Sequence, residues 1–240
     1  MMRRARAALA IAFAGVALAG CAGWGAMQGS PSPRIWDVHR ARFVPRDELE
    51  QRVIATRFRL LGEVHDNPMH HALRAELLRA LARAGRHPAV VFEQFDATHD
   101  AALQQAQRAG ADAEALARAG ALDRRAWEWP LHEPLIAAAL AAHLPVHAGN
   151  VSRTVLEAVV KDGTLHAIDA AWRVRIEHAA WDEGKARTLA HEIEEGHCGK
   201  IPASLVPRLA LAQRVRDAAL ATALLSDATA DGAVLIAGNG

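Results

Sequence analysis

The fold is decided by the stretch Leu60-Leu61-Gly62-Glu63-Val64-His65-Asp66-Asn67-Pro68-Met69-His70-His71. It places two acids, three imidazoles and an amide directly behind a short apolar run. A buried strand that delivers polar side chains at its carboxyl end is typical of open α/β sheets, which place their sites there. We therefore predict a strand here that ends in a functional site.

Three further apolar runs have the length of strands. The four runs span residues 58–61, 89–92, 144–148 and 233–237, and amphipathic Ala/Leu/Arg-rich stretches lie between them. Strands that alternate with helices predict an α/β fold with a mostly parallel sheet flanked by helices. In the stretch 69–84 the leucines recur at helical spacing, and Arg74 is expected on the solvent face.

One long span breaks this alternation. The Ala-rich segment from about 98 to 130 has no strand candidate. We expect it to form a small helical subdomain, inserted into a single α/β domain that covers residues 34–240.

The N-terminus has the pattern of a secretory signal. Three arginines precede an apolar run that is too short to span a bilayer, and this run closes on Leu18-Ala19-Gly20-Cys21, which resembles a bacterial lipobox. We predict a signal peptide over residues 1–20, lipidation of Cys21 and a flexible tether over residues 21–33. An ordinary cleaved signal is the alternative.

Charge and cysteine content exclude some classes of protein. Without the predicted signal peptide the chain keeps 25 Lys+Arg against 27 Asp+Glu, hence a net charge of −2, and it has no basic run. This balance argues against a nucleic-acid partner. Cys198 is the only other cysteine, so no intramolecular disulfide forms once Cys21 is acylated. Stability must then come from a hydrophobic core.

Each predicted strand is followed by polar or glycine residues: Gly62 to His65, Glu93-Gln94, Gly149-Asn150 and Gly238 to Gly240. The carboxyl ends of parallel strands meet at one edge of a sheet, so we expect a single crevice there. Glu63 and His65 are two residues apart and share a side, which suits a metal ion. Glu93 needs a partner if it is buried, and that ion, an imidazole from the end of the first strand or a structural arginine provides one.

The residues after His65 have two interpretations. Asp66 or Asn67 is expected to cap a helix that has Pro68 at its first position. His70 and His71 then fall in the first turn, where the helix dipole keeps imidazoles neutral and able to bind a metal. Alternatively, both histidines are ordinary surface residues.

The run from Trp127 to Pro134 concentrates aromatic residues in a chain without tyrosine. Its rings either form walls for a planar ligand beside His132 or anchor the core of the helical subdomain.

Two later segments carry further candidates. Gly196 is expected to end a helix and leave His197 on a loop as a candidate site residue. The six-residue interval from His191 to His197 excludes the zinc motif His-Glu-x-x-His. Arg216 shares a helix face with Gln213 and Asp217, so these residues either reach the crevice or form a surface pair.

In order and spacing, these motifs resemble the ChaN family of bacterial haem-binding lipoproteins, in the superfamily that contains the Tiki metalloproteases. The resemblance rests on Gly62 to Pro68 with His70-His71, Phe92 to Asp96, Trp129 to Pro134, Gly149-Asn150, His197-Cys198, Gln213 with Arg216-Asp217, and Gly238 to Gly240.

The resemblance implies a role in haem or iron uptake by a lipoprotein attached to the bacterial outer membrane. ChaN-like proteins hold two haems face to face between two subunits, with tyrosine as iron ligand, which implies a homodimer. This chain has no tyrosine, and His132 stands where the family's tyrosine is expected. We expect His132 to bind the iron, with Trp129, His197 and Arg216 around the porphyrin.

The Tiki branch implies an alternative, a metal-dependent hydrolase. Glu63, His65 and Glu93 would hold a divalent metal ion, and a bound water would attack the substrate. The second Gly-x-x-His element of that branch would need a histidine directly after Gly240, so we expect the chain to be truncated there. A third interpretation is a structural lipoprotein whose polar strand ends are caps and ion pairs. Whether the chain is an enzyme stays open.

Overall fold

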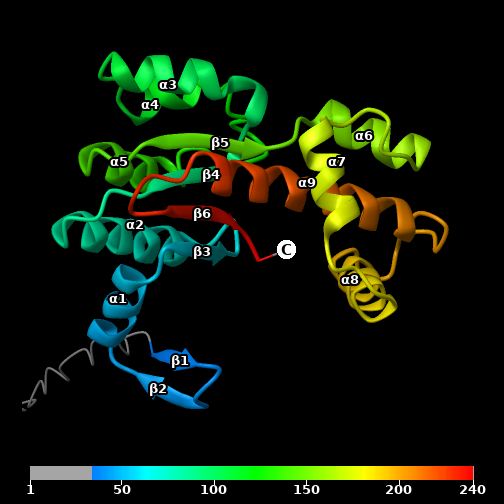
Figure 1. The fold of residues 1–240 in the computed structure, drawn as a ribbon, viewed down its shortest axis with the longest axis horizontal. Helices are drawn as coiled ribbons and strands as arrows, with labels where there is room; N and C mark the ends of the chain where they lie inside the picture. Colours follow the sequence, from blue (N-terminus) through cyan, green and yellow to red (C-terminus); the bar gives the residue numbers. More distant parts are fainter. Residues whose placement is uncertain (1–33, 240) are drawn as a thin grey trace, which may run out of the picture. The chain divides into compact units, whose positions relative to one another are not determined.

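The computed structural model describes residues 34–239 (Figure 1). The predicted signal peptide, the tether with Cys21 and the terminal Gly240 lie outside these residues. The chain divides into two compact units, one up to Phe43 and one from Val44 onward. Strands β1 (Ile35–Asp37) and β2 (Arg42–Val44) form a two-stranded sheet. The second unit contains all the residues discussed below.

Four parallel strands in the order β3-β6-β4-β5 form the sheet of the second unit. They are β3 (Phe58–Glu63), β4 (Ala89–Asp96), β5 (Val146–Asn150) and β6 (Ala233–Gly238). Each strand starts within two residues of a predicted apolar run. The predicted α/β class with a mostly parallel sheet is confirmed.

Helices fill the connections between the strands. They are α1 (Arg46–Ala55), α2 (Pro68–Arg83), the 3-10 turn η1 (Ala97–His99), α3 (Asp100–Arg108), α4 (Ala113–Ala119), α5 (Glu133–Ala141), α6 (Arg153–Asp162), α7 (Ala170–His178), α8 (Glu183–Gly196) and α9 (Val206–Ser226). At the start of α2, Asn67 accepts a hydrogen bond from the backbone N–H of Met69 at 3.0 Å. None of the helices within residues 34–239 has the length and apolar character that a membrane crossing needs.

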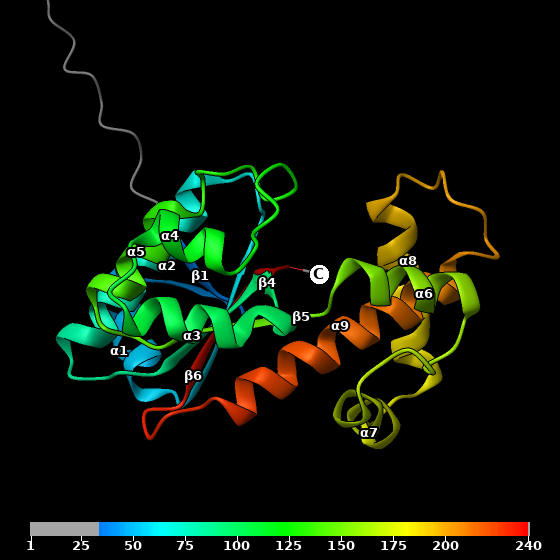
Figure 2. The ribbon, with the colours of Figure 1, turned by 90° about the horizontal axis from the view of Figure 1, so that it is seen from above.

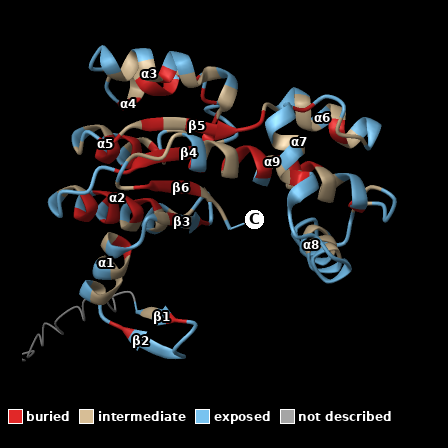
Figure 3. Cartoon of the chain, viewed as in Figure 1, coloured by how far each residue is buried: buried red, intermediate tan, exposed pale blue. Residues whose placement is uncertain are grey.

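The alternation of side chains along the strands builds two cores. Phe92 of β4 and Ile236 of β6 are fully buried in a cluster with residues of α2 and α5 on one face of the sheet. Val91 and Leu235 face the other way and pack against Leu220 of α9. Figure 3 shows the resulting red stripe of buried residues through the strands and the helices beside them.

A third cluster belongs to a helical lobe formed by α6, α7 and the first half of α9. The second half of α9 packs on the sheet, so this one helix joins the lobe to the sheet (Figure 2). The segment 98–130, where we expected the helical subdomain, forms η1, α3 and α4. These helices share the main core of the sheet through Leu103 and Leu116, whereas the separate cluster lies further along the chain.

A charged cluster ties β5 to the ends of two helices. His147 of β5 has its Nδ1 3.4 Å from Asp100 Oδ1 at the start of α3 and 3.7 Å from Asp227 Oδ2 after the end of α9. Burial alone would lower the pKa of His147, but the hydrogen bond to Asp100 and the two negative charges outweigh burial and raise it. The cluster is therefore an ion pair in slightly acidic solution.

This cluster predicts a pH dependence of stability. Because folding raises the pKa of His147, its contribution is complete below the unfolded value of 6.5 and is lost as the pH rises through the folded value. Between about pH 6 and pH 8.5 the free energy of unfolding of the wild type should fall relative to His147→Asn by up to about 1 kcal/mol. Urea unfolding at both pH values measures this. Parallel pH profiles for the two proteins would contradict the assignment.

Candidate functional site

The carboxyl ends of three strands converge on Glu93. Its Oε2 accepts a hydrogen bond from the backbone N–H of Gly238 at the end of β6, at 2.7 Å. Asn150 at the end of β5 donates its side-chain N–H to the carbonyl oxygen of Glu93 at 2.8 Å. Glu63 ends β3 and pairs in register with Gly238. The residues expected at one crevice therefore do meet at one edge of the sheet.

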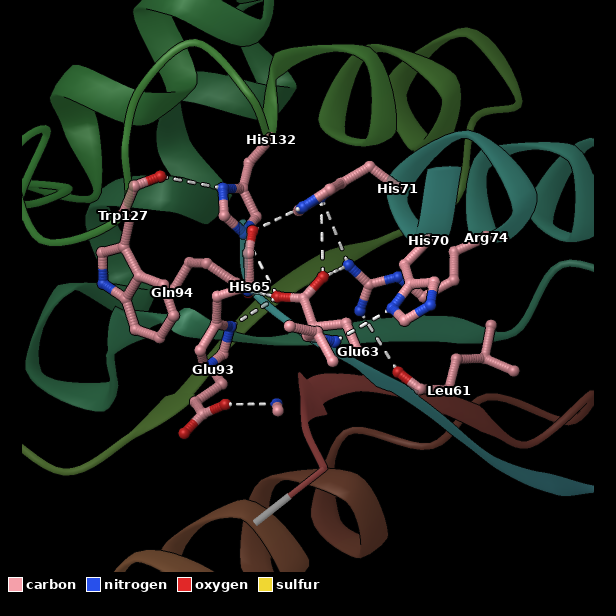
Figure 4. Close-up of polar contacts among 12 residues, drawn as sticks. Leu61, Glu63, His65, His70, His71, Arg74, Glu93, Gln94, Trp127 and His132 are labelled. Atoms are coloured by element: carbon pink, nitrogen blue, oxygen red, sulfur yellow. Dashed lines mark hydrogen bonds and ion pairs between the residues drawn. The ribbon is translucent and has the colours of Figure 1, made fainter. Parts of the chain in front are cut away.

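Glu63 is the centre of a buried polar cluster on the α2 and α5 face (Figure 4). Its side chain is fully buried. Its Oε1 lies 2.7 Å from His65 Nδ1, 3.1 Å from Gln94 Nε2, which donates to it, and 3.2 Å from His132 Nε2. Three segments far apart in the chain thus meet at one carboxylate oxygen.

Arg74 of α2 neutralises this carboxylate. Its Nη2 pairs with Glu63 Oε2, and its Nη1 donates to the carbonyl oxygen of Leu61 at 3.2 Å. Burial lowers the pKa of Arg74 to about 10, which still leaves it charged at neutral pH. The prediction that Arg74 lies on the solvent face is wrong: it is buried, because it shares a helical stripe with His71 and Leu78 and the buried carboxylate compensates its charge.

The two buried histidines of the cluster are neutral. Burial lowers the pKa of His71, and it lowers that of His132 to about 4. His71 Nε2 donates to the carbonyl oxygen of His65 at 2.8 Å, and His132 Nδ1 donates to that of Trp127 at 3.0 Å. The cluster therefore holds one cation, Arg74, and one anion, Glu63.

A divalent metal ion does not fit this cluster. Among residues 34–239, the acids, histidines and cysteines whose ligand atoms lie within 4.8 Å of one another are Glu63, His71 and His132. The guanidinium of Arg74 contacts the same carboxylate and lies 3.4 Å from His71 Nδ1, so it takes the place that an ion would need. A metal ion would have to displace a buried positive charge.

The metal set expected from the sequence, Glu63, His65 and Glu93, is not the set that the structure gathers. Glu63 faces α2, whereas Glu93 faces α9, where Arg216 Nε lies 3.8 Å from its Oε1. The carboxylates lie on β3 and β4, which are separated by β6, and they point to opposite faces of the sheet. The spacing of the motifs along the chain does not reveal this.

Removal of the internal cation gives a test of this interpretation. Arg74→Ala should lower the free energy of unfolding by about 3–5 kcal/mol, because it leaves Glu63 buried without a partner. Zn²⁺ should then raise the melting temperature of the variant, since Glu63, His71 and His132 can hold it, but should leave that of the wild type unchanged. The matched control is Arg79→Ala, at an exposed arginine of the same helix. Stoichiometric Zn²⁺ binding by the wild type would refute the assignment.

His65 differs from the other histidines of the cluster because it is open to solvent. Its side chain is 45% exposed, and its ring packs edge-on against Trp127, with centroids 4.8 Å apart and planes at 83°. Nδ1 is engaged by Glu63, whereas Nε2 has no hydrogen-bond partner among the described residues. His65 can therefore offer one nitrogen to a ligand.

Two adjoining cavities open beside His65. One, of about 450 Å³, lies between β3, β6 and α9, and the other, of about 410 Å³, lies between the end of β4, the loop after α4 and the start of α6. His65, Glu93 and Arg216 line both. Arg216 also donates through Nη1 to Gln213 Oε1 at 3.3 Å, and its buried Nε has no hydrogen-bond partner.

The remaining site residues predicted from the sequence lie elsewhere. His132 is completely buried, lines neither cavity and directs both ring nitrogens at protein oxygens. This placement does not suit the predicted role of iron ligand. Trp129 donates its indole N–H to Glu114 Oε2 at 3.1 Å and also lines neither cavity. His197 is exposed and caps the end of α8, with Nδ1 2.7 Å from the carbonyl oxygen of Ile193.

Arg74 was not predicted as a site residue, and Gln94 and Trp127 were predicted only as parts of longer segments. Arg74 could have been found from its spacing of three residues after His71. The direction of Gln94 could have been inferred because it is two residues after Phe92 and so points to the same face of β4 as that core residue. Trp127 carries no signal that separates it from Trp129, because only the turn before α5 decides which ring faces His65.

Comparisons with known proteins agree with this architecture. The sequence profile of the family described as haem-binding uptake, Tiki superfamily, ChaN matches residues 49–240. The solved structure of ChaN of Campylobacter jejuni with cofacial haem superposes with a TM-score of 0.71, at 19% identity, over 85% of this chain and 79% of that chain. The structure of the type III effector HopBA1, 16% identical over 80% of this chain and 70% of that chain, superposes with a TM-score of 0.42. No protein of curated function matches the sequence.

Proposed function

We propose that this chain, which belongs to the ChaN family of the Tiki superfamily, binds haem in the two cavities beside His65. The observation that carries the proposal is an exposed apolar wall next to an unengaged imidazole nitrogen. ChaN of Campylobacter jejuni, with the same fold, binds cofacial haem. Together the cavities have the size range of small-molecule sites.

The cavity between β3 and α9 suits the flat apolar face of a porphyrin. Its floor is formed by Leu60, Leu235 and Ala237, with Leu220 of α9 as a wall. Leu60 of β3 is 70% exposed, and Val64, the residue after β3, is 49% exposed, so both present apolar surface to solvent. Covering them with a bound porphyrin would remove this apolar surface from water.

Polar groups at the same place suit the charged edge of haem. Arg216 lines both cavities, and Arg153 lines the second one. Guanidinium groups frequently bind carboxylates in bidentate fashion, and the haem propionates are carboxylates. Bound haem would supply the iron, and the residues around it would orient the porphyrin and limit the access of water.

The alternative of a metal-dependent hydrolase has no comparable support. Its expected ligands Glu63 and Glu93 face opposite sides of the sheet, and Arg74 fills the position beside Glu63.

We also propose that the chain is a lipoprotein of the bacterial outer membrane that serves haem or iron uptake, and that two copies pair around haem. The lipobox-like sequence before Cys21 supports the anchor. Several acyl chains on this cysteine would give a stable attachment to the membrane, whereas a single chain would bind only marginally.

The anchor predicts labelling at one cysteine. In bacterial cells that express the full chain, radioactive palmitate should enter the wild type and Cys198→Ser, but not Cys21→Ser. Cys198 is the matched control because it is the other cysteine of the chain. Radioactive label in Cys21→Ser, or no label in the wild type, would contradict the proposed lipid anchor at Cys21.

If the porphyrin packs on the apolar residues around Leu60, a charge introduced at Leu60 should weaken haem binding. The purified full chain should bind ferric haem to saturation with a shift of the Soret band. Leu60→Glu should weaken this binding at least about tenfold, because a carboxylate would face the apolar porphyrin. Titration followed by absorbance measures the dissociation constant.

The matched control for this titration is Leu225→Glu, at an exposed leucine of α9 outside both cavities. It should bind haem as the wild type does. If the wild type shows no saturable shift of the Soret band, the proposed haem binding is wrong. If both variants bind haem equally well, the proposed position of the haem over Leu60 is wrong.

A further inference from the structure

We infer that Nε2 of His65 is the axial ligand of the haem iron and that the buried carboxylate of Glu63 is the group that holds it in this role. The inference rests on the proposed haem binding, and it adds the identity of the ligand in a chain that has no tyrosine.

The hydrogen bond between His65 and Glu63 determines which ring nitrogen is free. Nδ1 of His65 lies 2.7 Å from Glu63 Oε1, and Arg74 and Gln94 hold that carboxylate from other sides. An acceptor at this distance keeps the proton on Nδ1 and leaves the lone pair on Nε2. A carboxylate behind a ligating histidine also fixes the ring plane and makes the imidazole a stronger donor to a metal.

The absence of a side chain at Gly238 keeps Nε2 accessible. A Cβ atom at this position would lie 2.7 Å from His65 Nε2, closer than real Cβ atoms come to another atom, and 3.0 Å from Cε1, so the imidazole ring would have to move. Gly238 ends β6 without a positive φ angle, so backbone conformation does not demand glycine there. An alanine at position 238 would therefore fill the space beside His65 Nε2.

The neighbouring histidines cannot take this role in the observed arrangement. His71 and His132 are buried, and both ring nitrogens of each face groups of the protein. His70 accepts a hydrogen bond at Nδ1 from the backbone N–H of Val64 and lines neither cavity. Within residues 34–239, His65 is the histidine on the walls of both cavities.

Resonance Raman spectra of the purified full chain with ferrous haem test the assignment. The wild type should show an iron–imidazole stretching band. His65→Ala should lose the band and bind haem at least about tenfold more weakly. Added imidazole should restore the band, because it can fill the space that the side chain vacates.

A second variant keeps the histidine and blocks it. Gly238→Ala should lose the band although His65 is present, whereas Gly196→Ala, at a glycine with nothing within 4 Å of an added Cβ, should keep it. His197→Ala should also keep the band, since that residue lies at the end of α8. Far-UV circular dichroism of each variant verifies folding.

The outcomes separate this inference from the proposed function. If the wild type does not bind haem, the proposed function itself fails. If haem binds and His65→Ala retains the band, the function stands and the ligand assignment is overturned. If the band disappears in His132→Ala but not in His65→Ala, the ligand is His132 and the described geometry of the cluster changes on binding.

Discussion

The site depends on one buried ion pair, between Glu63 at the end of β3 and Arg74 of α2. A carboxylate in a protein core is destabilising unless it is paired and hydrogen-bonded. Here Arg74 pairs with one oxygen, while Gln94 and His65 engage the other. Because the charges cancel inside the core, burial can keep His71 and His132 neutral. Glu63 can therefore hold an exposed imidazole in a fixed orientation.

The sheet separates two tasks at its carboxyl edge. On the α2 and α5 face, the side chains of Glu63, Arg74, His71 and His132 are buried, and the Glu63 carboxylate positions His65. On the α9 face, Glu93, Arg216 and the apolar wall around Leu60 are open to cavities. His65 lies between these regions: its Nδ1 belongs to the closed cluster and its Nε2 to the open side. A single helix, α9, covers that face only in part, which leaves room for a ligand.

The sequence predicted much of the fold and part of the site. Apolar runs and their polar ends predicted four strands and their convergence, because burial and alternation are local properties. It could not show that Glu63 and Glu93 point to opposite faces, since this depends on the register of β3 and β4 with β6. Arg74 was assigned to solvent because the leucine spacing of its helix gives no sign of the buried Glu63 carboxylate that pairs with it. His132 was expected to bind the iron, and its sequence context did not show that it lies completely buried beside Glu63.

The central claim is that the iron of bound haem lies at His65, and anomalous diffraction at the iron edge from crystals of the haem-loaded chain tests it most directly. The account predicts an iron peak within bonding distance of His65 Nε2, in the space beside Gly238, with the porphyrin over Leu60. An iron peak bonded to any other residue, or a porphyrin outside the two cavities, would contradict it.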